Sequence, residues 1–146
     1  MTYMNKRASI NEILPGRIYQ RGQFLTWPYE QKKRLLEQLG IDVVVNLWSK
    51  VDPDLSSGSL GRVYLCWPTS PSEVPECADL FVEFLVNLVR VGKRILIHCE
   101  AGRGRSVWLS ARVLADVEGI PRAEALRRIS SIMHHSLTLA LMGDLA

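Results

Sequence analysis

The fold of this chain is decided by the stretch His98-Cys99-Glu100-Ala101-Gly102-Arg103-Gly104-Arg105-Ser106. An apolar run at 95–97 precedes this stretch, and a helix-like run at 106–117 follows it. A strand, a tight glycine-containing loop and a helix start together favour anion binding, because successive backbone N–H groups and the positive end of the helix dipole attract negative charge. The sequence therefore predicts a phosphate-binding loop whose donors are the backbone amides of residues 100–105.

Two side chains of this loop add reactive chemistry to the predicted anion site. The dipoles that attract a phosphate also stabilise the thiolate of Cys99, which stands at the mouth of the loop. Arg105 follows six residues later and carries a planar guanidinium that grips two phosphate oxygens at once. The pattern indicates a phosphate site that contains a nucleophile. The alternative is that Cys99 is a buried, inert thiol.

The size and composition of the chain fit one domain with a proper core. The chain has 146 residues, of which 47% are hydrophobic, and a formal net charge of +3. This mild positive charge suits an anionic substrate but does not by itself indicate a nucleic acid. We expect a single domain over 1–146, with a poorly ordered start at about 1–12.

Cysteine usage and hydropathy indicate a compartment for the protein. Three cysteines form an odd count at no metal-like spacing, which favours neither a disulfide framework nor a zinc site and fits a reducing cytosol. The segment 1–7 has no apolar run behind it, so we expect no signal peptide. The longest apolar stretch, 80–91, is interrupted by polar residues and is too short to span a membrane. We therefore expect a cytoplasmic protein that uses no metal and no cofactor.

Hydrophobic periodicity predicts alternating strands and helices along the chain. We expect strands at 17–20, 41–47, 62–67 and 94–98, and helices at 28–39, 76–90, 106–117 and 121–133, with a short helical segment at 137–142. Thr26 is the expected N-cap of the first helix, and Lys32 is expected on its solvated face. The segments 49–61 and 68–75 are expected to be loops. The fold class is α/β, with a mostly parallel central sheet flanked by helices and a ligand crevice at the carboxyl ends of the strands.

The motif His-Cys-x5-Arg-Ser at 98–106 resembles the signature of the cysteine-dependent phosphatases, which include the protein tyrosine and dual-specificity phosphatases. The flanking strand, the glycines and the helix start make this resemblance more specific than the Cys-x5-Arg spacing alone. The stretches 15–19 and 43–47 also resemble the smaller members of this superfamily. The resemblance covers about residues 13–133 and implies a dual-specificity-phosphatase-like fold.

The resemblance implies a phosphomonoester hydrolase with defined residue roles. Cys99 attacks phosphorus to form a cysteinyl-phosphate intermediate, which water hydrolyses. Arg105 and the loop amides bind the phosphate oxygens. Ser106 donates a hydrogen bond to the sulfur, His98 holds the loop from below, and Asn46 braces the loop backbone.

The expected general acid of such an enzyme is missing from its usual place. The resemblance implies an aspartate in the loop that begins at 66–68, but positions 69–72 contain no acid. Glu73 is the nearest carboxylate and is our candidate for the acid. The alternatives are Glu76, the two aspartates of the loop 49–61, or no protein acid at all.

The missing acid affects which class of substrate we expect. Alkyl phosphates need a proton for their leaving oxygen, whereas a phenolate needs it less and a phosphoanhydride less still. We therefore expect a phosphoprotein substrate carrying phosphotyrosine, with an RNA 5′ end as an alternative. Arg103 resembles the basic loop residues of lipid phosphatases, which makes a phosphoinositide a further alternative. Alternatively, Arg103 has a structural role and forms an ion pair with Glu100.

Two other classes of function, and a disulfide that involves Cys99, are also compatible with parts of the sequence. Without an acid, the protein is alternatively a catalytically weak phosphate-binding pseudophosphatase. A rhodanese-type sulfurtransferase also places a cysteine in a loop of this size, although Gly102 and the Arg105-Ser106 ending favour a phosphatase. Cys66 is expected near Cys99 if their strands are neighbours, which allows a protective disulfide; the alternative is a core thiol.

Overall fold

The computed structural model describes residues 10–133 and 136–146 and places a five-stranded sheet at the centre. The strand order is β1-β2-β5-β3-β4, with β1 antiparallel to β2 and every other pair parallel. The strands are β1 (Asn11–Leu14), β2 (Ile18–Arg21), β3 (Val43–Asn46), β4 (Val63–Cys66) and β5 (Ile95–His98). The predicted α/β fold with a mostly parallel sheet is confirmed.

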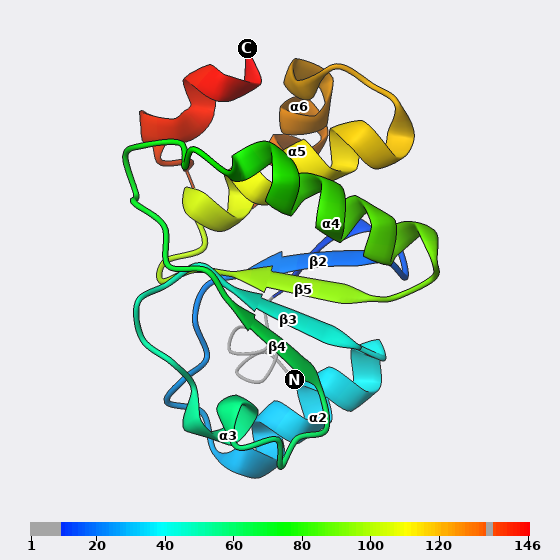
Figure 1. Cartoon of the computed structure of the whole chain (residues 1–146), viewed down its shortest axis with the longest axis vertical. Coiled ribbons are helices and arrows are strands. Elements are labelled where there is room, and N and C mark those ends of the chain that lie inside the picture. The colour runs from blue at the N-terminus through cyan, green and yellow to red at the C-terminus, as the bar shows by residue number, and fades with distance from the viewer. Residues whose placement is uncertain (1–9, 134–135) are drawn as a thin grey trace.

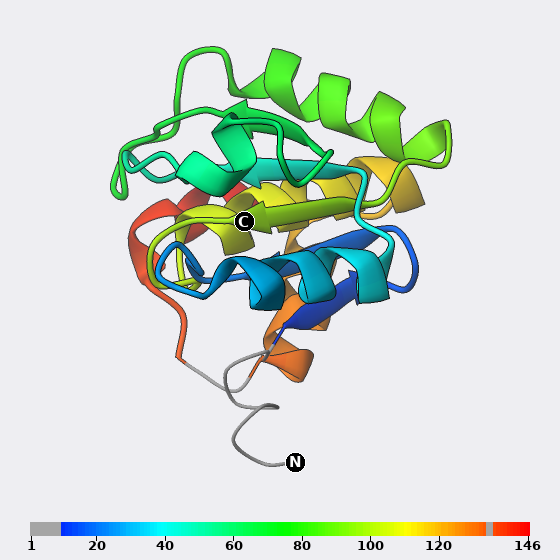
Figure 2. The same cartoon turned by 90° about the horizontal axis from the view of Figure 1, so that it is seen from below.

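Helices cover both faces of the sheet (Figures 1 and 2). One face carries α2 (Tyr29–Leu39) and the short α3 (Pro53–Ser56). The other carries α4 (Ala78–Arg90), α5 (Arg105–Glu118), α6 (Arg122–Ile132) and the 3-10 helix η1 (Leu139–Leu145). Within the described ranges, no helix has the length and apolar character needed to cross a membrane.

Successive residues of the central strands point into two different cores. Val43 and Val45 of β3 pack with α4 and α5, whereas Val44 packs with the α2 side. On β5, Ile95 and Ile97 join the first core and Leu96 joins the second. This explains why the strands read as continuous apolar runs, as expected for a parallel sheet covered on both faces.

Three local expectations from the sequence are wrong. Residues 11 and 12 belong to β1 rather than to a disordered start, because β1 pairs with β2 at the sheet edge; residues 1–9 lie outside the described part of the chain. Helix α2 has Pro28 as its N-cap and no side-chain cap, so Thr26 does not cap it. The segment 49–61 is not all loop, since α3 begins at Pro53 after the capping carboxylate of Asp52.

Lys32 is buried rather than solvated. Its residue exposure is 1%, and its Nζ lies 3.0 Å from Asp52 Oδ1 and 2.8 Å from Asp54 Oδ2. Asp52 is also buried, so the charges compensate each other away from water. This pair ties α2 to the start of α3 and fixes the loop that follows β3.

Breaking the buried ion pair is expected to destabilise the fold. Lys32→Met keeps most of the side-chain volume but leaves the buried carboxylate of Asp52 without its cation, at an expected loss of roughly 3–5 kcal/mol in the free energy of unfolding. Lys33→Met is the matched control, because Lys33 is exposed on the same helix, and it should change stability by less than about 0.5 kcal/mol. Urea unfolding measures both variants. Equal midpoints for the two variants would contradict the account.

Candidate active site

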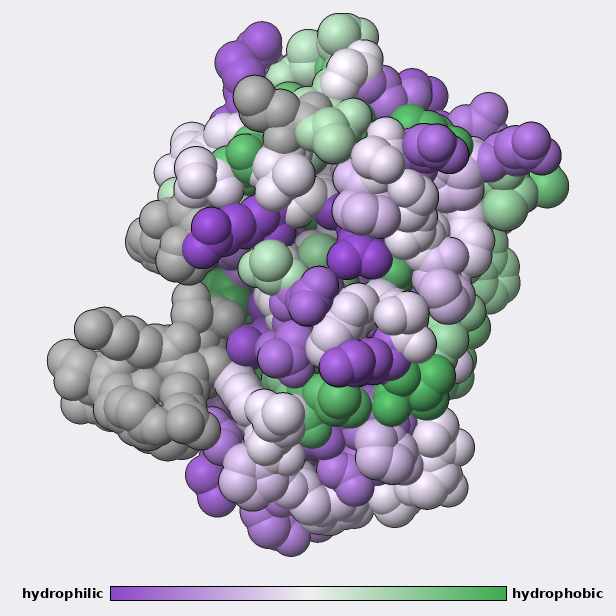
Figure 3. Space-filling model, turned by 90° about the vertical axis from the view of Figure 1, so that its left-hand side faces the viewer, coloured by the Kyte–Doolittle hydropathy of each residue, from purple (hydrophilic) through white to green (hydrophobic). Residues whose placement is uncertain are grey.

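Cys99 lies at the point where the central strand of the sheet ends. It follows β5 directly, and the loop it opens leads into α5 at Arg105. The neighbouring strands β2 and β3 run parallel to β5, so their carboxyl ends meet at the same edge (Figure 1). Figure 3 looks onto this edge, where hydrophilic side chains gather across the centre of the face. The cysteine loop therefore lies at the edge of the sheet where a ligand crevice is expected.

The loop is shaped by close packing against the backbone that follows β2. Gly102 has φ +75°, and a Cβ there would lie 2.4 Å from the backbone nitrogen of Gly22. A Cβ on Gly22 would in turn lie 3.0 Å from the carbonyl oxygen of Ala101. The N–H of Gln23 donates to the carbonyl of Glu100 at 2.8 Å. Glycine at 102 is thus required by both backbone conformation and space.

The amides of the loop form a set of unused donors. Within residues 10–133 and 136–146, the backbone N–H groups of residues 100–104 donate to no protein acceptor. Glu100, Ala101 and Arg103 are exposed, so these donors are open to an acceptor from solvent, and a run of successive amides before a helix forms a concave site for an anion. The N-terminus of α5 adds its positive dipole end. This arrangement can bind an oxyanion.

The nucleophile candidate contacts a hydroxyl at the start of α5. Cys99 Sγ lies 3.1 Å from Ser106 Oγ, and both residues are buried. Gln20 Nε2 also reaches this hydroxyl, at 2.7 Å, although the sequence analysis did not identify Gln20 as a site residue. The sequence carries no specific signal for it, because Gln20 stands beside Arg21 at the polar end of a short strand.

Arg105 is held over the loop that follows β4. Its Nη1 donates to the carbonyl oxygens of Thr69 at 3.2 Å and Leu47 at 3.5 Å. Its Nη2 lies 4.0 Å from an oxygen of Glu100. The loop after β4 is anchored where the Trp67 ring packs on Phe81 of α4, with ring centroids 3.8 Å apart. The guanidinium therefore belongs to the same site as the loop amides.

His98 is buried beneath the loop, as the sequence predicts. Its Nδ1 lies 3.2 Å from the carbonyl oxygen of Cys99, and its ring packs edge-on against Phe24. Burial, together with the positive charge of Arg21, lowers the pKa of His98 to about 4, against the weaker raising effect of the Cys99 carbonyl. The imidazole is therefore neutral at pH 7.

Two residues predicted near the loop occupy other positions. Asn46 does not brace the cysteine loop: its side chain bonds Lys50 and Tyr64 and accepts the N–H of Trp48, which supports its own loop. Cys66 is not on a strand next to Cys99, because β3 lies between β4 and β5. Two strand spacings of about 4.8 Å exceed the Cα separation of roughly 7 Å that a disulfide tolerates, so the protective disulfide is ruled out in this arrangement.

The carboxylates considered as general acids have different surroundings. Glu73 and Glu76 are exposed in the loop between β4 and α4. Within the described residues, neither has a hydrogen bond or an ion pair. Asp52 and Asp54 are committed to Lys32, so they do not fold over the site. Glu100 approaches Arg105, and no ion pair between Arg103 and Glu100 is found within the described residues, so the alternative that these two residues pair is wrong.

The C-terminal segment is tied to the helix behind the loop. The N–H of Thr138 donates to the carbonyl of Arg103 at 2.9 Å. Asp144 accepts from Trp108 Nε1 at 2.8 Å and from Arg112 Nη1 at 3.1 Å. These contacts give Trp108, which is fully buried, its structural role.

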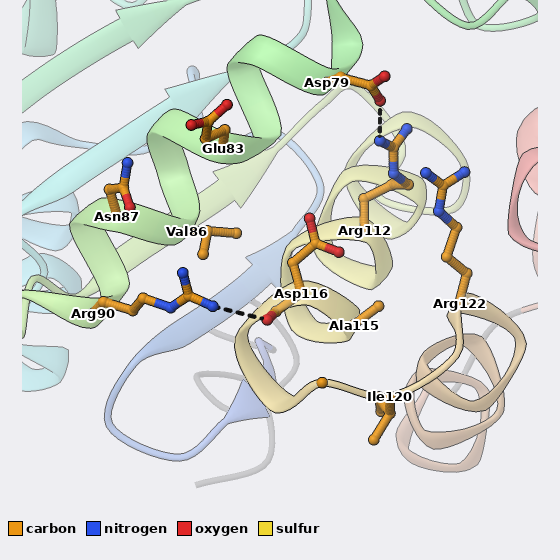
Figure 4. A pocket seen from close by; sticks show the side chains of 11 residues that line it. Asp79, Glu83, Val86, Asn87, Arg90, Arg112, Ala115, Asp116, Ile120 and Arg122 are labelled. Carbon is orange, nitrogen blue, oxygen red and sulfur yellow. Dashed lines mark hydrogen bonds and ion pairs between the residues drawn. The ribbon is translucent and has the colours of Figure 1, made fainter.

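A hollow with a volume of about 670 Å³ lies between α4 and α5 (Figure 4). Arg112 crosses it to reach Asp79 at 2.5 Å, and Arg90 donates to the carbonyl of Asp116 at 3.2 Å. Cys99 is not among its lining residues. Arg112 and Arg122 also pair with Asp144, which lies outside the lining, so the contacts of this hollow join helices to one another and to the C-terminal segment.

Known proteins that are similar to this chain include one named as a tyrosine phosphatase. The sequence matches no protein-family model. It is 25% identical over 118 residues to the protein named "Putative tyrosine phosphatase 197R" of Invertebrate iridescent virus 6, in a match that covers 74% of this chain. The chain spans less than half of that relative, 44% of its length.

Solved structures share the fold over nearly the whole chain. Tk-PTP in its active form has a TM-score of 0.77 at 22% identity, covering 94% of this chain and 92% of that one. PTPMT1, also solved in complex with PI(5)P, has a TM-score of 0.74 at 21% identity, covering 93% and 90%. Human DUSP28 has a TM-score of 0.72 at 18% identity, covering 93% and 88%. The chain has the fold of the cysteine-dependent tyrosine and dual-specificity phosphatases.

The buried His98 predicts a loss of stability in acid. Because its pKa is about 4 in the folded state and about 6.5 in an unfolded chain, the unfolded state binds the proton first as the pH falls. The free energy of unfolding should fall between about pH 6.5 and 4, by roughly 3 kcal/mol from this group. His98→Gln should lack this component. Urea unfolding across this range measures the difference, and parallel curves for the two proteins would contradict the assignment.

Proposed function

We propose that this protein is a cysteine-dependent phosphatase that hydrolyses phosphate monoesters through a cysteinyl-phosphate intermediate. The observation that carries the proposal is the run of amides at 100–104, unpaired within the described residues, directly after a cysteine whose sulfur contacts the Ser106 hydroxyl. These features supply an oxyanion site and a stabilised thiolate at one place. The phosphatase fold supports the same activity.

In the first step, the Cys99 thiolate attacks phosphorus opposite the leaving oxygen. An S–P bond forms, the P–O bond to the leaving group breaks, and the leaving oxygen takes a proton from an acid or from water. The amides of residues 100–105 and the Arg105 guanidinium bind the three equatorial oxygens. Catalysis of this kind depends mainly on positioning and electrostatic stabilisation.

In the second step, water attacks the phosphorus of the intermediate. The water loses a proton to a base, the S–P bond breaks, and inorganic phosphate leaves. The sulfur departs as a thiolate, which the Ser106 hydroxyl stabilises by donating a hydrogen bond at 3.1 Å. His98 supports the loop from below through its contact with the Cys99 carbonyl.

We propose a phosphoprotein with phosphotyrosine as the preferred substrate. Cys99 has an exposure of only 2%, so a phosphate must reach down to it, and a phenolate leaves with less need for an acid. PTPMT1 has been solved in complex with PI(5)P, which keeps a phosphoinositide as an alternative substrate. An RNA 5′ end is a further alternative on leaving-group grounds.

The proposed location is the cytoplasm. Cys66 and Cys77 are both exposed free thiols, which suits a reducing compartment.

The central test is turnover of a small aryl phosphate. Cys99→Ser should reduce hydrolysis to background, because a neutral hydroxyl does not replace the thiolate as nucleophile. Cys66→Ser is the matched control, since Cys66 is exposed and lies two strands away, and it should keep full activity. Hydrolysis that survives in Cys99→Ser would overturn the proposed function.

We propose Glu73 as the general acid, and a comparison of substrates with good and poor leaving groups tests this role. Glu73→Gln should lower kcat on alkyl phosphates by about 100-fold or more, because the poor leaving oxygen needs a proton. Turnover of nitrophenyl phosphate should change little. Glu76→Gln serves as the control for the same loop. If Glu73→Gln hydrolysed every substrate at the rate of the unmodified protein, Glu73 would be excluded as the acid. Water or the substrate would then be the proton source.

A second candidate function rests on the position of the carboxylates. Among the described residues, Glu73 and Glu76 make no side-chain contact with Cys99 or Arg105, which favours a phosphate-binding module with weak catalysis. Such a module would bind phosphopeptide with the same affinity in Cys99→Ser and turn over near background. Turnover well above background in the unmodified protein would exclude this second function.

A further inference from the structure

A chain of hydrogen-bonded polar side chains leads from the edge of the sheet to the nucleophile. Gln20 lies on β2 with no exposed surface. Its Nε2 lies 2.9 Å from the carbonyl oxygen of Gly102 and 2.7 Å from Ser106 Oγ. Its Oε1 lies 2.8 Å from Asn11 Nδ2 on β1, and Ser106 Oγ lies 3.1 Å from Cys99 Sγ.

The direction of each proton follows from the chemistry of the partners. The carbonyl of Gly102 only accepts, so the atom of Gln20 that faces it must be the amide nitrogen, which only donates. Asn11 donates to the other end of the same amide and holds it in this orientation. Ser106 therefore accepts from Gln20, and its single hydroxyl proton is left to point at the sulfur of Cys99.

We propose that Gln20 is a positioning residue for the reaction. Its side-chain amide makes the Ser106 hydroxyl a fixed hydrogen-bond donor to the Cys99 thiolate. This inference rests on the proposed phosphatase function. Without the Gln20 amide, the hydroxyl is free to rotate and to accept from the neutral thiol, which would favour the unreactive form. Gln20 and Ser106 are fully buried, so the hydrogen bond acts in a low-dielectric environment that strengthens it.

A second contact of Gln20 acts on the loop itself. By donating to the Gly102 carbonyl, Gln20 turns that oxygen toward β2 and away from the side of the loop that binds an anion. The same amide thus orients both the hydroxyl and the loop backbone. The loop contribution affects phosphate binding, whereas the hydroxyl contribution affects the ionisation of the thiol, so the two can be measured separately.

The test measures thiolate formation without relying on turnover. The rate at which iodoacetamide alkylates Cys99 is followed against pH in a Cys66→Ser, Cys77→Ser background, because the other two thiols are exposed and would react. The midpoint of this pH dependence reports the ionisation of Cys99. Hydrolysis of an aryl phosphate by the same proteins is measured alongside it.

Gln20→Met should move the midpoint up by about one pH unit, which slows alkylation about tenfold below the midpoint. Gln20→Glu should move it in the same direction, because a carboxylate takes the Ser106 proton away from the sulfur; it carries the test if the first variant does not fold. Gln23→Met is the matched control, since among the described residues the Gln23 side chain only accepts a hydrogen bond from the N–H of Leu25. It should leave the midpoint unchanged.

The dependence on Ser106 decides the mechanism. In a Ser106→Ala background, Gln20→Met should cause no further shift of the midpoint, because no hydroxyl is left to orient. An unchanged midpoint in folded Gln20 variants, or a shift that persists without Ser106, would overturn the proposal even if the protein hydrolyses aryl phosphates. If aryl phosphates are not hydrolysed but the shift appears, the proposed function fails while the orienting role of Gln20 stands.

Discussion

Gly22 and Gly102 bring two backbone segments closer together than any side chain would permit. A Cβ on Gly102 would collide with the backbone of residues 21 and 22, and one on Gly22 would press against the carbonyls of residues 100 and 101. This contact locks the end of β2 onto the cysteine loop. Strand β2 pairs with β5 from Ile18 opposite Ile95 to Arg21 opposite His98. The sheet therefore fixes the position of the loop.

The remaining parts of the site are arranged around this contact. The strand before the loop is buried on both faces, so Cys99 starts from a rigid position. Helix α5 has its N-terminus at the end of the loop, and it packs against α4, α6 and the C-terminal segment. The loop after β4 reaches the site through the carbonyl of Thr69, which accepts from Arg105. Rigid elements thus position the anion-binding groups, whereas the exposed loop carries the candidate acid.

The sequence was sufficient for the parts of the fold that depend on local pattern. The strand, loop and helix start around Cys99 are confirmed because hydrophobic runs and glycines mark them directly. The strand order was not accessible, which is why Cys66 was expected next to Cys99. Lys32 was assigned to solvent because helical periodicity does not reveal a carboxylate brought from another loop. The role of Gln20 was not predictable for the same reason, since its partners in the cysteine loop and at the start of α5 lie more than 80 residues away.

The proposed mechanism depends above all on Cys99 acting as a covalent nucleophile. The most direct measurement is to denature the protein rapidly during turnover of an aryl phosphate and to determine by mass spectrometry which peptide carries a phosphoryl group. The account predicts a single phosphoryl group on the peptide that contains Cys99. Turnover without a phosphorylated Cys99, or with the phosphoryl group on another residue, would contradict it.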